Sequence, residues 1–125
     1  VGIKNQIKKM VSSDLTAKAM GSGRLDVFAT PAMVAMMEEA AHTSVEAELE
    51  EGQGTVGTSM TVSHLAATPV GMEVTCESEL IEVDRRKLVF EIKAMDEAGL
   101  IGEAKHERFI IDSEKFLAKT NAKLK

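Results

Sequence analysis

The first candidates for chemistry are two adjacent carboxylates, Glu38 and Glu39, in a stretch whose apolar residues recur at helical spacing. Because residues three or four apart share one face of a helix, Glu38 falls on an apolar strip and Glu39 on a side that faces water. A carboxylate on an apolar strip loses solvation, so we expect its pKa to rise unless a partner compensates. Such a group can act as a general base, although Glu38 could instead reach water from the edge of the strip. The strip also contains Val34, Ala41, Val45 and Leu49.

Histidines are the next candidates, because their unperturbed pKa lies close to neutrality. His64 ends an apolar strand face, where it could act as a base beside a buried glutamate or orient one. The alternative is a hydrogen-bonded core or turn histidine without a catalytic role. His106 has more charged neighbours, and His42 shows no special pattern, so both rank below His64.

Thr30 and Gly57 could place main-chain donors around a reacting carbonyl. Thr30 precedes Pro31, which predicts Thr30 as a helix N-cap and Pro31 as the first helical residue. A helix N-terminus favours negative charge and suits a developing oxyanion, although the cap role alone would account for Thr30. Gly57 interrupts a predicted strand, which indicates a bulge or close approach of a ligand to the main chain.

Other common catalytic motifs are missing from the sequence. It contains no HExxH, no GxSxG and no P-loop, and its only cysteine, Cys76, excludes a multi-cysteine zinc site. Catalysis would therefore use glutamate, histidine, threonine and main-chain donors, and we expect neither a metal nor a cofactor.

The elements that must position these residues follow from periodicity and turn signals. We expect a first strand within 1–13, a turn capped by Asp14, and a helix of about 20 residues from Thr30 to Gly52. Four strands are then predicted. The first two cover 54–67 and 72–83, the third lies between turns at 84–87 and 96–99, and the fourth covers 100–111 and is followed by a short terminal helix. Strict alternation would place one set of side chains of the 54–67 strand on a common face, namely Val56, Thr58, Met60, Val62 and His64.

This order predicts an α+β fold, an antiparallel meander packed on one long helix. The 125 residues suit a single domain, 1–125. A net charge of −5 and a pI near 5.2 argue against broad nucleic-acid binding. No segment is apolar enough to span a membrane, and the lone Cys76 fits a reducing, cytoplasmic compartment.

Three segments of the chain carry a family pattern, VFATPAMVAMMEEAA (27–41), GTVGTSMTVSHLAATPVG (54–71) and GEAKHERFII (102–111). Together they resemble the fluoroacetyl-CoA thioesterase-like branch of the hot-dog superfamily, from about residue 25 to 116. The resemblance implies a hot-dog fold, in which a five-stranded antiparallel sheet wraps a central helix. It also implies sheets paired edge to edge in a homodimer or tetramer, with active sites at the subunit interface.

The resemblance also assigns residues. It implies a catalytic set of Thr30, Glu38 and His64, a main-chain oxyanion donor at Gly57 and a supporting role for Arg108. The best-known specialised member has an aromatic gate before the first segment and a Trp after the helix glutamate. Leu25 and Glu39 stand in this chain instead, which argues against the selectivity for a fluorinated substrate.

The leading hypothesis is therefore hydrolysis of an acyl-CoA, with a short or aromatic acyl group, to free acid and CoA. Glu38 would be a general base or a nucleophile, and His64 would orient the attacking group or protonate the leaving thiolate. The basic turn of Arg85, Arg86 and Lys87 could bind CoA phosphates, or could simply be a solvated hairpin turn. Alternatives are a non-catalytic acyl-CoA-binding protein, a hydratase, for which no Asp–His pair is found, and a purely structural oligomer.

Overall fold

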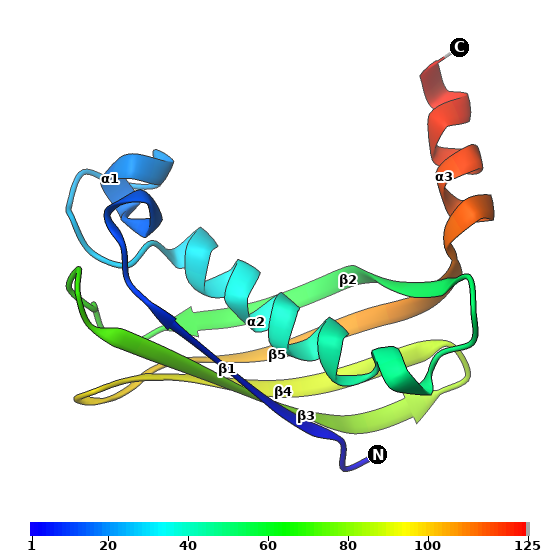
Figure 1. Cartoon of the computed structure of the whole chain (residues 1–125), viewed down its shortest axis with the longest axis horizontal. Coiled ribbons are helices and arrows are strands. Elements are labelled where there is room, and N and C mark those ends of the chain that lie inside the picture. Colours follow the sequence, from blue (N-terminus) through cyan, green and yellow to red (C-terminus); the bar gives the residue numbers. More distant parts are fainter. Residues whose placement is uncertain (125) are drawn as a thin grey trace.

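The computed structural model describes residues 1–124, and in it a five-stranded antiparallel sheet curves around one central helix, α2 (Figure 1). This is the α+β, hot-dog arrangement predicted from the sequence. The last residue of the predicted domain, Lys125, lies outside the described residues. The strands are β1 (Lys4–Met10), β2 (Gln53–His64), β3 (Glu73–Asp84), β4 (Lys87–Asp96) and β5 (Gly99–Asp112). The helices are α1 (Ala17–Met20), α2 (Thr30–Ser44) and α3 (Ser113–Asn121), with short 3-10 turns at Ser13–Leu15, Glu46–Glu48 and Ala122–Leu124.

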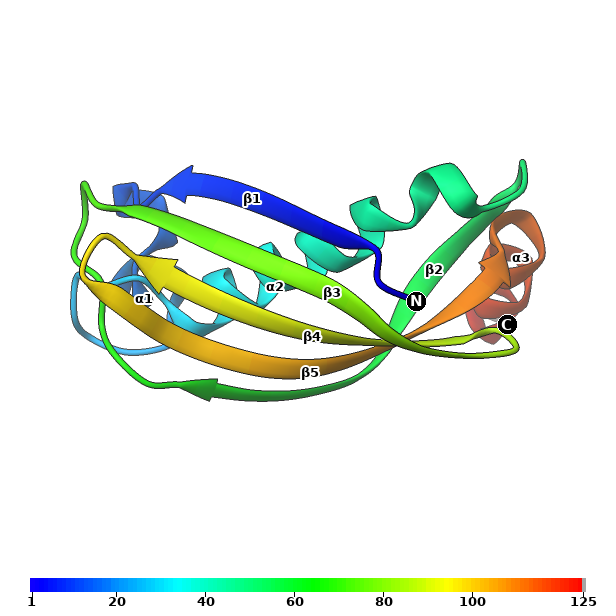
Figure 2. The ribbon, with the colours of Figure 1, turned by 90° about the horizontal axis from the view of Figure 1, so that it is seen from below.

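The strand order is β1-β3-β4-β5-β2, so β1 and β2 form the two edges of the sheet (Figure 2). Hairpins join β3 to β4 and β4 to β5, whereas β2 crosses from the helix to the far edge and pairs with β5. Lysines on β1 face water, as expected for an edge strand. Within residues 1–124, no helix is long and apolar enough to cross a membrane.

The core lies between the concave face of the sheet and α2, and methionines supply much of it. Met33, Met36 and Met37 on the helix are fully buried against Phe90 and Ile92 of β4. The strip that carries Glu38 is only partly buried, because Ala41 and Val45 are buried whereas Val34 and Leu49 are half-exposed. Alternate side chains of β3 and β4 point into this core, namely the buried Val74, Cys76, Ser78, Leu80, Leu88, Phe90, Ile92 and Ala94.

The central helix is shorter than predicted, because α2 ends at Ser44 and only a 3-10 turn follows. Near this end of the helix, side chains donate hydrogen bonds to main-chain carbonyls. The Ala40 carbonyl accepts from Asn5 Nδ2 at 3.1 Å and from Ser78 Oγ at 3.2 Å, while the Ser44 hydroxyl donates to the Ala41 carbonyl. Such bonds compete with the main-chain ladder and favour the end of the helix.

Two predicted caps are wrong. The N-cap of α2 is Ala29, so Thr30 is already helical and its hydroxyl caps nothing. Asp14 lies inside the Ser13–Leu15 turn, and the side chain that caps α1 belongs to Thr16, which accepts from Ala19 N at 3.1 Å. The terminal helix does follow the prediction, with Asp112 capping α3.

The predicted common face of β2 is also wrong, because the register with β5 shifts between Gly57 and Ser59. Such a β-bulge inserts Thr58 as an extra residue and reverses the alternation on either side of it. Met60, Val62 and His64 therefore share the inner face with Gly57, whereas Val56 lies opposite Phe109 on the outer face. The bulge thus turns Gly57 toward the helix.

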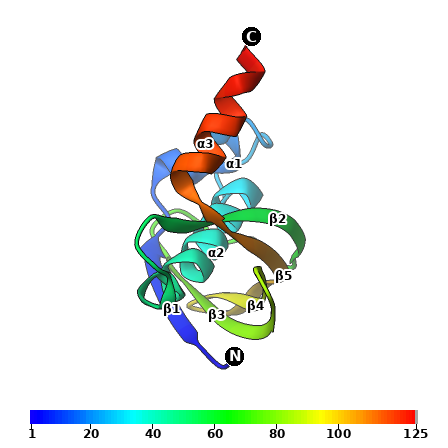
Figure 3. The same cartoon turned by 90° about the vertical axis from the view of Figure 1, so that its right-hand side faces the viewer.

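The C-terminal helix α3 projects away from the body of the molecule (Figure 3). It is attached where β2 begins, because Ser113 N donates to the Gly52 carbonyl at 2.9 Å. Its apolar residues Phe116 and Leu117 are exposed in the single chain.

Candidate active site

Thr30 and His64 meet at the N-terminus of α2. The Thr30 hydroxyl lies 2.7 Å from His64 Nδ1, a short hydrogen bond between the first helical residue and the last residue of β2. Burial lowers the pKa of His64, against a smaller opposing effect of the Ala66 main chain. The second ring nitrogen, Nε2, is buried and has no hydrogen-bond partner within residues 1–124. This histidine is therefore neutral near pH 7 and retains an unused polar atom.

A cleft of about 310 Å³ opens beside this pair. Thr30 and His64 line it together with small and apolar residues of α1, the 21–29 loop and the 65–71 loop. The 65–71 loop is anchored below, because the buried Thr68 hydroxyl donates to Asp96 at 2.8 Å and the Thr68 carbonyl accepts from Phe28 N. The lining residues are Ala17, Ser22, Val27, Phe28, Leu65, Ala66 and Ala67.

Glu38 lies farther along α2 and faces β2 and β5. Its Oε2 is 3.5 Å from Arg108 Nη1, within ion-pair range but longer than a usual hydrogen bond. The predicted burial of Glu38 on an apolar strip is only partial, since 42% of its side chain is exposed, against 8% for Arg108. A Cβ built on Gly57 would lie 3.1 Å from the same Oε2 atom. The absence of a side chain at Gly57 therefore keeps the carboxylate and the strand main chain in close contact.

Arg108 is held on two sides by other groups. Its Nε donates to the Thr55 hydroxyl at 2.8 Å and its Nη2 donates to the Thr55 carbonyl at 3.0 Å. Its Nη1 lies 3.1 Å from Nε2 of the buried His106, whose Nδ1 is 2.8 Å from the Ser59 carbonyl. Burial lowers the pKa of Arg108, and Glu38 opposes that effect. The guanidinium thus presents a fixed donor to Glu38.

The sequence-predicted catalytic residues form two groups within one chain. Thr30 and Glu38 are eight residues apart on α2, which corresponds to a rise of about 12 Å. On the sheet, His64 pairs with Gly102 and Gly57 with Arg108, so the two groups lie about 20 Å apart along β5. One thioester carbonyl cannot contact both groups of a single chain at once.

The predicted phosphate-binding residues occupy the β3–β4 turn, where Lys87 pairs with Phe109, the residue that follows Arg108 on β5. Arg85, Arg86 and Lys87 line a surface hollow of about 510 Å³ with Asp84 and the exposed Phe109. Arg85 has a left-handed main chain, with φ of 59°, as the tight turn requires. The turn combines three cations with an aromatic surface.

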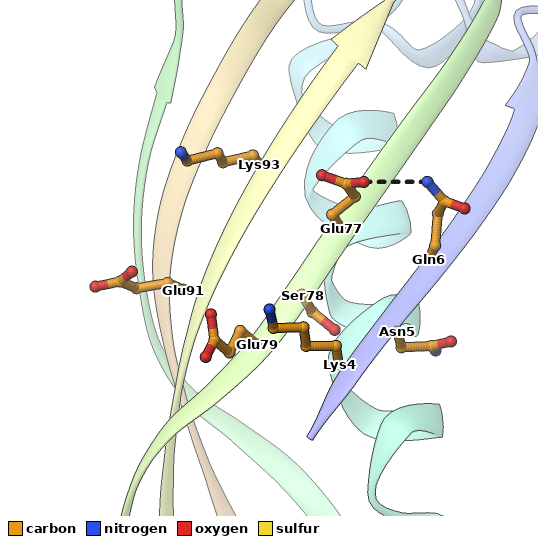
Figure 4. A pocket seen from close by; sticks show the side chains of 8 residues that line it. All are labelled: Lys4, Asn5, Gln6, Glu77, Ser78, Glu79, Glu91 and Lys93. Atoms are coloured by element: carbon orange, nitrogen blue, oxygen red, sulfur yellow. Dashed lines mark hydrogen bonds between the residues drawn. The ribbon is translucent and has the colours of Figure 1, made fainter. Parts of the chain in front are cut away.

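Another surface hollow, of about 680 Å³, lies over β1, β3 and β4 and contains none of the predicted residues (Figure 4). Charges of both signs line it, and Gln6 Nε2 donates to Glu77 at 3.1 Å. Lys93 pairs across the strands with Glu77, whereas Glu79 opposes Glu91. This is a solvated, charged sheet face without the polar groups converging on one point that a catalytic site requires.

Catalysis by a cysteine thiolate or by a metal ion finds little support in residues 1–124. Burial raises the pKa of Cys76 to about 12, so this thiol stays protonated near neutral pH. Across residues 1–124, no three His, Cys, Asp or Glu side chains are grouped to hold a metal ion. Glu39 pairs with Lys9 at 3.1 Å and Leu25 is exposed.

Sequence reasoning ranked His106 low, yet it is almost fully buried beside the candidate glutamate. Its charged neighbours Lys105 and Glu107 point to the other face of β5, because strand side chains alternate. The His-x-Arg spacing of 106 and 108 was the available signal, since it places both side chains on one face. Thr55, which holds Arg108, carried no comparable signal.

Comparisons with known proteins identify the family of the chain. The family model of fluoroacetyl-CoA-specific thioesterases matches residues 11–114. The fluoroacetyl-CoA thioesterase of Streptantibioticus cattleyicolor is 44% identical over 98 residues, which are 78% of this chain and 70% of that protein. A solved structure of the fluoroacetyl-CoA thioesterase FlK has a TM-score of 0.93 at 36% identity, covering 98% of this chain and 96% of that one. A thioesterase superfamily member from Thermus thermophilus has a TM-score of 0.89 at 27% identity, covering 97% and 90%. The chain therefore belongs to the fluoroacetyl-CoA-specific thioesterase family, and it is a thioester hydrolase.

Proposed function

We propose that this protein hydrolyses short-chain acyl-CoA thioesters to a free acid and CoA. The observation that carries the proposal is the close approach of the Glu38 carboxylate to the main chain at Gly57, where an added Cβ would lie only 3.1 Å from Glu38 Oε2. The family supports the choice of CoA, since a variant of FlK has been solved in complex with acetyl-CoA, with a TM-score of 0.93 to this chain. The small cleft at Thr30 supports a short acyl group.

In the proposed reaction, the thioester carbonyl lies against the Gly57 main chain, whose N–H stabilises the oxyanion of the tetrahedral intermediate. Glu38 either takes a proton from the attacking water or attacks the carbonyl itself to form a mixed anhydride. Arg108 orients the carboxylate, because its Nη1 lies 3.5 Å from Glu38 Oε2 and the guanidinium is itself held by hydrogen bonds to Thr55. The CoA thiolate then leaves with a proton.

A single turnover in ¹⁸O-labelled water tests whether Glu38 attacks the thioester. If water hydrolyses the anhydride at the Glu38 carbonyl, Glu38 gains ¹⁸O in its own carboxylate and the acid of the first turnover carries the bridging ¹⁶O from Glu38. If water attacks the acyl carbonyl instead, the bridging oxygen returns to Glu38 and the acid gains one solvent oxygen, so labelled Glu38 identifies the nucleophile and a second trap of the anhydride, by hydroxylamine, is needed when Glu38 stays unlabelled. A general base never exchanges an oxygen with the product, so the acid formed in the first turnover contains one solvent oxygen and the enzyme contains none.

The Thr30–His64 pair completes the proposed site from a second subunit. Two groups that lie about 12 Å apart on α2 can serve one carbonyl if each comes from a different chain. The edge strand β2 contributes both Gly57 and His64, and within residues 1–124 its outer side pairs with no other strand. A homodimer joined at this edge, of twice the 13.5 kDa chain mass, would bring the two groups together. The free Nε2 of His64 would then protonate the leaving thiolate.

Subunit mixing tests this arrangement. Thr30→Val and Glu38→Gln variants, each inactive alone, are mixed in equal amounts and allowed to exchange. If one site combines Thr30 of one chain with Glu38 of the other, half of the dimers carry one intact site, which restores about a quarter of wild-type activity. A site built within one chain regains no activity on mixing, and sedimentation of the wild type as a monomer would also exclude the shared site.

The remaining parts of the proposal concern CoA and the setting. The β3–β4 turn, with Arg85, Arg86 and Lys87, is proposed to bind CoA phosphates. Replacing the three by Gln should raise KM for acyl-CoA and leave kcat unchanged, whereas an unchanged KM would reduce the turn to a solvated hairpin. A buried, unpaired Cys76 is consistent with the proposed cytoplasmic location.

The main experiment follows free thiol release from acyl-CoAs that range from acetyl and fluoroacetyl to long-chain and aromatic. We expect turnover of the short chains, and loss of most turnover in Glu38→Gln with its fold intact by circular dichroism. A variant in which Arg24 is replaced by Gln, outside both groups, serves as the matched control. Acyl-CoA binding without turnover across the panel would favour the non-catalytic binding protein instead.

A further inference from the structure

We propose that His106 is a positioning residue, which as a neutral ring with its proton on Nδ1 fixes the Arg108 guanidinium so that one N–H is directed at Glu38. The inference rests on the proposed catalytic role of Glu38. It concerns a residue whose hydrogen bonds go to the Ser59 carbonyl and to Arg108, so that it acts on the carboxylate through its neighbour.

The hydrogen bonds of His106 determine its tautomer. Nδ1 lies 2.8 Å from the Ser59 carbonyl, which can only accept, so Nδ1 must carry a proton. Nε2 lies 3.1 Å from Arg108 Nη1, which can only donate, so Nε2 must present its lone pair. A doubly protonated ring would set an N–H against the guanidinium and lose this bond. The two contacts therefore select a single neutral tautomer.

His106 and Thr55 together restrain the Arg108 guanidinium. Thr55 holds Nε and Nη2 from one side, and the histidine holds Nη1 from the other. Because the guanidinium is rigid and planar, fixing three of its N–H groups also fixes the remaining ones. The second Nη1 hydrogen is thereby directed toward Glu38, 3.5 Å away.

The His106 ring also connects the β2 bulge to the Arg108 guanidinium. Its Nδ1 bonds the carbonyl of Ser59, the first paired residue after the register shift. A Cβ built on Gly57 would contact Glu38 Oε2, His106 Cε1 and Arg108 Nη1 at 3.1, 3.2 and 3.4 Å. The histidine thus holds both the carboxylate's partner and the strand segment proposed to bind the oxyanion.

The surroundings of His106 favour its neutral form. Burial lowers its pKa most, and the Arg108 charge on β5 lowers it further, against the Ser59 carbonyl and the Glu38 carboxylate on α2. From β4 it faces the Phe90 ring, with centroids 6.3 Å apart, and from β2 it is paired with Met60. No element packed against it adds a charge beyond Arg108 and Glu38 among the described residues.

The tautomer can be observed without any activity measurement. Long-range ¹H–¹⁵N correlation spectra of the full chain at pH 7.5 distinguish the three protonation states of each histidine ring. We expect His106 as the Nδ1–H tautomer, assigned by its absence in a His106→Gln sample. A ring protonated on Nε2, alone or together with Nδ1, would overturn the proposal.

Two substitutions then separate positioning from packing. His106→Gln places an amide oxygen near the Nε2 position and can still accept from Arg108, whereas His106→Asn reproduces only the Nδ1 donor. We expect His106→Asn to lower kcat about 10- to 100-fold with little change in KM, because Arg108 and Glu38 are then misplaced. His106→Gln should have a kcat much closer to that of the wild type. Equal kcat in both variants, after correction for the folded fraction, would leave His106 a purely structural residue.

The outcomes also separate this proposal from the function on which it rests. An active Glu38→Gln variant would remove the proposed role of Glu38 but leave the tautomer measurement valid. If Glu38→Gln is inactive and His106→Asn, as a separate variant, has wild-type kcat, the function is supported and the positioning role of His106 is rejected.

Discussion

Adding one methyl group at Gly57 should remove most of the hydrolytic activity while leaving the fold in place. The new Cβ would lie 3.1 Å from Glu38 Oε2, 3.2 Å from His106 Cε1 and 3.4 Å from Arg108 Nη1, all closer than ordinary contact or at its limit. Gly57 has no left-handed main chain, so alanine brings no torsional penalty. The effect must therefore come from crowding.

The magnitude follows from which neighbour can move. His106 and Arg108 are buried and held by several hydrogen bonds, whereas the Glu38 carboxylate is the half-exposed end of a flexible side chain. Glu38 should therefore retreat by a few tenths of an ångström or more, at a cost near the lower end of overpacking, about 1 kcal/mol. A displacement approaching 1 Å of a catalytic group can lower the rate about 100-fold. We expect kcat to fall by about 10- to 100-fold.

The assay compares thiol release from acetyl-CoA with the urea-induced unfolding of the same samples. Gly54→Ala is the matched control, because its Cβ would also meet an oxygen at 3.1 Å, the Ser113 hydroxyl, on the same strand but outside the site. Loss of activity in both variants would trace the effect to β2 as a whole. Wild-type kcat in Gly57→Ala would refute the placement of Glu38 and Gly57 in one reaction centre.

Three further predictions concern stability and protonation. Thr30→Val should reduce activity and lower the free energy of unfolding in urea by about 0.5–1.5 kcal/mol, because it removes the hydrogen bond to His64; a wild-type free energy of unfolding would show that this bond contributes no stability. Gly102→Ala should destabilise by about 1–3 kcal/mol in the same assay, since its Cβ would lie 2.7 Å from the fully buried Met33 sulfur; wild-type stability would show that Met33 can move. His64 and His106 have pKa values below the ordinary 6.5 in the folded state, so below about pH 6.5 the unfolded chain binds more protons. The contribution of the two neutral histidines to the free energy of unfolding is complete above that pH and is lost as the pH falls. Urea titrations at pH 7.5, 6.5 and 5.5 would measure it, and a free energy of unfolding that rises toward pH 5.5 would contradict the lowered pKa values.

The parts of the fold that follow local rules could be predicted from the sequence. Alternation in β3 and β4 places Val74 and Phe90 inside without ambiguity, and the turn at Asp84–Lys87 separates these strands. The apolar face of α2 follows from its helical period. The family pattern added the association of Thr30 with His64, whose hydrogen bond the structure contains.

Features fixed by distant partners could not be predicted in this way. The end of α2 depends on Asn5 and Ser78, which donate to the Ala40 carbonyl from other strands. Gly57 did indicate a bulge, and the register shift between Gly57 and Ser59 confirms one. The effect of the bulge on the faces of β2 was not predicted, because the identity of the extra residue, Thr58, has no signal of its own in a strand rich in threonine and serine. The partial exposure of Glu38 depends on Arg108, seventy residues later in the chain.

Two features that look unfavourable in a single chain are accounted for by the same proposed dimer. The twelve residues of β2 leave one edge of the sheet without a partner strand among the described residues, and such edges tend to be paired or blocked. The buried Nε2 of His64 has no hydrogen-bond partner in the described part of the chain, residues 1–124, and a buried polar atom left in this state costs about 1–3 kcal/mol. Pairing β2 with its copy would cover the edge and bring a second set of site residues toward His64. A carboxylate or substrate group delivered to Nε2 would then remove its desolvation penalty, so that dimerisation and catalysis would depend on the same strand.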